Sequence, residues 1–170
     1  MTSWWESDPD RLARDLREVP AHFPDLRFER AGAGRWSGRL PDWPFDRPRP
    51  AGLDELTGGY GLLLDMYYPQ SYPMVPPNVF PREPEPDVLM RTQHRWHLNG
   101  DGSLCLLRVP ELWTGREPVI DLLLKAAGWR IEYELMKANL IDRMSENGIV
   151  TDPTYDHLVE GASCQKSASS

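Results

Sequence analysis

Cys105 is the one cysteine in a part of the sequence that has the pattern of folded structure, because Cys164 lies in a polar C-terminal segment. His94, His97 and Asn99 precede Cys105 by eleven residues or fewer. A cysteine thiolate is a strong nucleophile toward activated acyl groups. Imidazole and amide N–H groups can stabilise the negative charge that develops on the acyl oxygen. These residue types therefore predict acyl transfer through a cysteine.

The residues around Cys105 indicate how its thiol is presented. Gly100 and Gly102 permit a tight turn just before the cysteine, and the apolar Leu104 and Leu106 would hold the segment against a core. An unperturbed thiol is only slightly ionised at neutral pH. An acyl group that arrives as a thioester is already reactive, so no strong adjacent base is required. We interpret Cys105 as an acyl carrier; the alternative is a buried structural cysteine.

The polar residues upstream have two possible uses. His97 could stabilise the oxyanion or position the nucleophile, or it could only form hydrogen bonds within the loop. His94 is better suited to a structural role. A zinc site on His94, His97 and Cys105 would lack a fourth ligand with a recognised spacing. We therefore predict no metal and no cofactor, and the candidate catalytic residues are Cys105, His97, Asn99 and His94.

The elements that would position this loop begin with a helix. Residues 8–18 have amphipathic spacing, with Asp8 as the expected N-cap and Pro20 as the expected end. An antiparallel β-meander should follow, since apolar residues alternate with polar ones or form short runs between turn residues. Its strands are predicted at residues 26–30, 35–40 and 59–68, with a short fourth strand after the proline-rich loop that runs from Tyr68 to Pro81.

A second helical region follows the cysteine. Residues 118–145 have helical spacing of apolar side chains, with a capping box at Thr114 and Glu117. Gly128 is expected to bend or break this helix. From Asp152 onward the periodicity is lost, which is typical of a disordered end.

Length and composition set the remaining limits. We expect one domain over residues 1–150 and a largely disordered tail over residues 151–170. The net charge of −7 and pI near 5.1 argue against a nucleic-acid-binding surface. No charged-then-apolar leader and no apolar run of about 18 residues is present, so we expect no membrane partner. A cytoplasmic location follows, in which Cys105 stays a free thiol.

Over roughly residues 8–145 the chain resembles the ubiquitin-conjugating enzyme family. One block, residues 63–80, is similar to the third strand and the Tyr-Pro-x-x-Pro-Pro loop of that family. The other is the Gly-Ser-Leu-Cys-Leu sequence at 102–106, with Trp113 eight residues after the cysteine, as in the family. The resemblance implies an α+β fold with an N-terminal helix, a four-stranded antiparallel meander and C-terminal helices.

The resemblance also implies a function. Cys105 would accept a ubiquitin-like protein as a thioester from an activating enzyme, both acting in trans, and would transfer it to a lysine or another amine on a target protein. The family has a His-Pro-Asn sequence upstream whose Asn lies eight residues before the cysteine, where this chain has His97. His97, His94 or Asn99 would replace that Asn. Divergent bacterial members, which look like parts of antiphage conjugation systems, can carry such a histidine.

Two other functions remain open from the sequence. A non-catalytic module of the same fold would bind a ubiquitin-like protein without a thioester, although Cys105 in its family setting favours the carrier. A cysteine hydrolase that removes such modifiers is weaker. It would need a histidine from elsewhere in the fold as base, and the candidate His157 lies near the tail.

Overall fold

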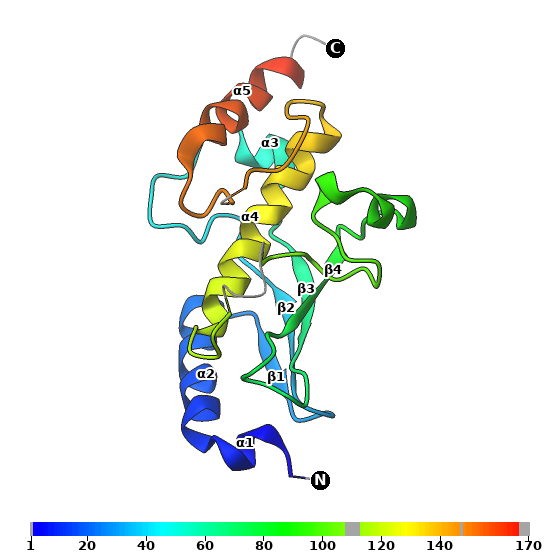
Figure 1. Cartoon of the computed structure of the whole chain (residues 1–170). Helices are drawn as coiled ribbons and strands as arrows, with labels where there is room; N and C mark the ends of the chain where they lie inside the picture. Colours follow the sequence, from blue (N-terminus) through cyan, green and yellow to red (C-terminus); the bar gives the residue numbers. More distant parts are fainter. Residues whose placement is uncertain (1, 108–112, 147, 167–170) are drawn as a thin grey trace.

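A computed structural model describes residues 2–107, 113–146 and 148–166, with the side chains of residues 163–166 excepted. The chain forms an α+β structure with a four-stranded antiparallel sheet (Figure 1). In chain order the elements are α1 (Trp4–Ser7), α2 (Pro9–His22), β1 (Arg27–Glu29), β2 (Arg35–Arg39), α3 (Leu53–Thr57), β3 (Leu63–Tyr67), β4 (Asn78–Glu83), the 3₁₀ helices η1 (Val88–Thr92) and η2 (His94–Trp96), α4 (Val119–Lys137), the 3₁₀ helix η4 (Pro153–Tyr155) and α5 (Asp156–Lys166).

The sheet is the predicted meander. The strand order is β1-β2-β3-β4, and each strand pairs antiparallel with the next. Side chains alternate between the two faces of the sheet. One face carries the buried side chains of Trp36, Leu64, Met66 and Val79. Figure 1 shows α4 running along the sheet, with α1 and α2 toward one end and α3 and α5 toward the other. The α+β class and the four strands are thus confirmed.

Helix α2 begins as predicted and ends later. Asp8 is the N-cap, and its Oδ1 accepts a hydrogen bond from the Arg11 amide at 3.1 Å. Pro20 was expected to stop the helix but lies inside it. The proline is exposed, and the amide of Phe23 still donates to the carbonyl of Val19 at 2.8 Å. One lost backbone hydrogen bond in the last turn is tolerated where packing of the neighbouring residues holds the chain.

The prediction of a break at Gly128 was wrong, because α4 is continuous through it. A Cβ atom at this position would lie 2.7 Å from Cγ2 of Ile149. The glycine therefore allows close approach of a packed segment and does not interrupt the helix. The helix also ends at Lys137, earlier than predicted. The amide of Thr114 does donate to Oε2 of Glu117 at 2.9 Å. The two residues close a turn that precedes the helix, whose N-cap is Pro118.

The predicted tail is also corrected, because much of it folds as η4 and α5. Val159 on α5 is fully buried in the common core, and α5 packs against α3, an element the sequence did not indicate. Arg47 contacts Asp156 at 2.8 Å and donates to the carbonyl of Val150 at 2.9 Å. Residue 151 therefore does not begin a separate tail. The expectation of disorder at residues 167–170 falls outside the described residues.

No described helix has the length and apolar character needed to cross a membrane.

A buried carboxylate on α4 makes stability depend on pH. The Glu132 side chain is buried, and its Oε1 accepts hydrogen bonds from the amide and hydroxyl of Ser145. Burial raises its pKa from 4.5 to about 6. The folded state therefore binds a proton more tightly than the unfolded state. This contribution to stability is fully present below pH 4.5 and is lost as the pH rises through about 6.

Glu132→Gln is expected to remove this pH dependence, since glutamine keeps the acceptor oxygen and carries no charge. At pH 7.5 the variant should exceed the wild type in free energy of unfolding by about 2 kcal/mol. At pH 4.5 the two should agree. Urea unfolding at both pH values measures the difference, with Glu85→Gln, an exposed residue, as control. If the free energy of unfolding of the variant changed between the two pH values as much as that of the wild type, Glu132 would not be the titrating group.

Candidate functional site

The residues before Cys105 form a short β-hairpin. Leu98 and Leu104 pair as an antiparallel bridge, and both side chains are buried. The amide of Asn99 donates to the carbonyl of Ser103 at 2.8 Å. The amide of Gly102 closes the turn on the carbonyl of Asn99 at 3.0 Å, and its φ of +91° lies in the region that favours glycine. This confirms the predicted tight turn.

The hairpin is attached to both layers of the fold. The amide of Leu104 donates to the carbonyl of Val79 on β4 at 2.8 Å, which fixes the hairpin to the sheet. The indole N–H of Trp129 on α4 donates to the carbonyl of Trp96 at 2.9 Å, which fixes the segment before the hairpin. The cysteine loop is thus held between the last strand and α4.

Cys105 leaves the hairpin with its backbone held and its side chain exposed. Its amide donates to the carbonyl of His97 at 2.8 Å. Its thiol Sγ lies 3.9 Å from the carbonyl oxygen of Leu107. The Nζ of Lys125 on α4 donates to the carbonyl of Leu106 at 3.4 Å. A thiol that is accessible on a fixed backbone can be approached by a large acyl donor without rearrangement of the core.

Of the three candidate polar residues, His97 lies closest in register to the cysteine. It is half-buried and adopts the left-handed conformation, with φ 49° and ψ 47°, at the end of η2. The backbone hydrogen bond to Cys105 sets the two residues opposite each other in the hairpin. His94 is exposed at the start of η2, and its carbonyl accepts the His97 amide at 3.1 Å. The structure therefore brings His97 to Cys105 and leaves His94 one turn away.

Asn99 holds the turn. Its Nδ2 donates to Oγ of Ser103 at 2.9 Å and to the carbonyl of Leu104 at 3.4 Å. Ser103 is buried, and its amide and hydroxyl donate to Oδ1 of Asp101 at 2.9 and 2.7 Å. These hydrogen bonds keep the pKa of Asp101 below its usual value. Sequence reasoning missed Ser103, whose only signal was its place in the family-like Gly-Ser-Leu-Cys-Leu block.

Trp113 connects the cysteine segment with the proline-rich loop. Its side chain is buried, and its Nε1 donates to the carbonyl of Pro73 at 2.7 Å. Its ring lies 6.4 Å, centroid to centroid, from that of Tyr72. The two sequence blocks that carry the family resemblance are therefore in direct contact.

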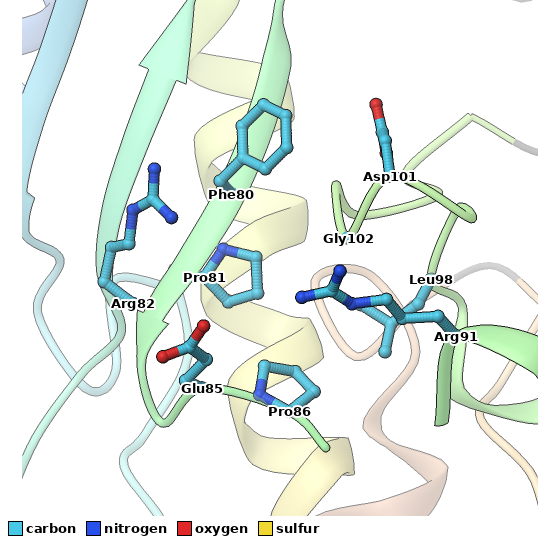
Figure 2. Close-up of a pocket in the computed structure, with 9 residues that line it drawn as sticks. All are labelled: Phe80, Pro81, Arg82, Glu85, Pro86, Arg91, Leu98, Asp101 and Gly102. Carbon is cyan, nitrogen blue, oxygen red and sulfur yellow. The ribbon is translucent and has the colours of Figure 1, made fainter. Parts of the chain in front are cut away.

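A cavity of about 170 Å³ lies beside the hairpin, on the side of β4 (Figure 2). Arg82 lines it, and its Nε donates to Asp65 at 2.7 Å. Arg91 comes from η1, and its guanidinium carbon lies 2.9 Å from where a Cβ on Gly102 would stand. Arg91 therefore packs directly against the turn before Cys105. The sequence contained no pattern that singled out this residue.

Within the described ranges, no three His, Cys, Asp or Glu side chains are grouped in a way that could hold a metal ion. Comparison with known proteins does not assign a family. No family model matches the chain, and no curated protein matches it significantly in sequence.

Proposed function

We propose that this protein is a ubiquitin-like-protein conjugating enzyme that carries its modifier as a thioester on Cys105. The observation that carries the proposal is the exposed thiol of Cys105 on a backbone held on both sides, with His97 opposite it. The order of α2, the meander, the cysteine hairpin and α4 supports it, because the resemblance predicts that order. The ubiquitin-conjugating type of fold is part of the same proposal.

Two acyl transfers make up the proposed reaction. The Cys105 thiolate attacks the thioester carbonyl of the modifier on an activating enzyme; a new C–S bond forms, and the activating enzyme leaves as a thiolate. A target amine then attacks the Cys105 thioester; a C–N bond forms, the C–S bond breaks, and the amine proton leaves to solvent or to the thiolate. The energy is stored in the thioester, so neither step needs ATP or a metal ion.

Asn99 and His97 together replace the family's Asn, which the resemblance implies holds the loop and stabilises the oxyanion. Asn99 binds Ser103 and Leu104 and so fixes the loop. His97 donates a hydrogen bond to the oxyanion that forms when the amine attacks, since it lies opposite Cys105 in the hairpin. A cytoplasmic bacterial conjugation system of the antiphage type is proposed on resemblance alone.

A charging assay tests the proposal. The protein is incubated with its cognate activating enzyme, the modifier and ATP, and the products are separated with and without reductant. We expect an adduct that reductant removes. Binding of the free modifier is measured in parallel by calorimetry. Binding without an adduct would replace the enzyme with the binding module described above.

A further inference from the structure

Lysine is rare in this chain and one lysine is held next to the cysteine. Of its 19 lysine and arginine residues, only three are lysines: Lys125, Lys137 and Lys166. Lys125 lies on α4, is half-buried, and donates from Nζ to the carbonyl of Leu106 at 3.4 Å. Leu106 directly follows Cys105. The amine of Lys125 is therefore hydrogen-bonded to the same short backbone segment that carries the thiol.

Covalent geometry limits how far the two groups can be from each other. Seven bonds connect Sγ of Cys105 to the carbonyl oxygen of Leu106, so these atoms lie within roughly 9 Å of each other and Nζ lies within roughly 12 Å of Sγ. The flexible four-carbon stem of lysine allows Nζ to leave the carbonyl of Leu106 and to move toward Sγ. Lys137 is twelve residues further along α4, which is about 18 Å, and its Nζ lies 4.0 Å from Oε2 of Glu134. Of the two lysines whose side chains the structure describes, Lys125 is therefore the one held at the cysteine segment.

We propose that Lys125 is a self-modification site that accepts the acyl group from Cys105; this rests on the proposed carrier function. The uncharged Nζ attacks the carbonyl carbon of the Cys105 thioester. The C–N bond of an isopeptide forms, the C–S bond breaks, and the amine proton passes to the departing thiolate. The product keeps the modifier permanently beside a free Cys105. Self-modification competes with transfer to targets and limits the lifetime of the charged enzyme.

A small thioester tests the step without any partner protein. The full chain is incubated with the thiophenyl thioester of N-acetylglycine, which mimics a modifier's C-terminal glycine. The products are treated with hydroxylamine, which removes thioesters and leaves amides, and are then mapped by mass spectrometry. We expect an acetylglycyl amide on Lys125 whose rate of formation is independent of protein concentration.

Three variants make the result specific. Lys125→Arg keeps the cation and the donor to Leu106, and we expect hydroxylamine-sensitive acylation of Cys105 with at least a tenfold loss of the stable amide. Lys137→Arg should behave as the wild type. Cys105→Ala should lose both products, and equal acylation of Lys125 in that variant would contradict the proposal. A Cys105 thioester whose acyl group never moves to Lys125 would overturn the self-modification of Lys125 and leave the carrier function standing. A Cys105 that the probe does not acylate would contradict both.

Discussion

Alanine in place of His97 is expected to leave thioester formation on Cys105 within about twofold of the wild type and to slow transfer to an amine by about 100-fold. Both steps pass through a tetrahedral oxyanion, but a thiolate attacks a thioester more readily than an amine does, so transfer to the amine should depend more on a hydrogen-bond donor. His97 is the candidate residue that pairs with Cys105 in the hairpin. Single-turnover discharge of the charged protein into free lysine measures the second step separately.

His94→Ala is the matched control for this prediction. His94 is exposed on η2, one turn from the hairpin, and its discharge rate should stay within about twofold of the wild type. Asn99→Ala should affect both steps, because Asn99 holds the turn that presents the thiol. Equal discharge rates in His97→Ala and the wild type would assign His97 to loop structure only.

The largest expected effect on stability concerns Asp15 on α2. Its side chain is fully buried, and Oδ2 accepts hydrogen bonds from the hydroxyls of Tyr68 at 2.9 Å and Tyr72 at 3.1 Å. The indole of Trp36 donates to the Tyr68 hydroxyl at 2.9 Å. Burial raises the pKa of Asp15, while these hydrogen bonds oppose the shift. The carboxylate therefore joins α2 to the proline-rich loop directly, and to β2 through Tyr68 and Trp36.

Asp15→Ala is expected to lower the free energy of unfolding by about 3 kcal/mol, because two buried hydroxyls lose their acceptor and a cavity replaces the carboxylate. Asp15→Asn keeps an acceptor oxygen and should cost about 1 kcal/mol or less. Urea unfolding followed by tryptophan fluorescence measures both. Equal losses in the two variants would show that the negative charge, which both variants remove, sets the effect of Asp15, and not the acceptor oxygen or the side-chain volume.

Local patterns predicted the sheet and the cysteine turn well. The alternation at residues 26–30 and 35–40 corresponds to β1 and β2, because a strand with one buried face shows period-two spacing directly. Glycine at position 102 marked a positive φ, which is a local property of the backbone. The proximity of His97 to Cys105 followed from the hairpin that this turn creates.

Long-range packing explains the errors. Gly128 looked like a helix breaker because the sequence does not show that Ile149 packs onto it. Residues 156–166 looked disordered because their helix is held by α3 and by Arg47, both of which lie about a hundred residues earlier. The roles of Asp15 and Arg91 depend on partners in other elements, so no pattern around either residue could indicate them.

The measurement that tests the central claim most directly is the location of the modifier on the charged protein. The charged chain is digested under mildly acidic conditions that preserve thioesters, and the peptides are mapped by mass spectrometry. We predict the modifier's C-terminal residue on Cys105, with charging lost in Cys105→Ala and retained in Cys164→Ala. Attachment to Cys164, or a reductant-sensitive adduct that survives in Cys105→Ala, would contradict the account.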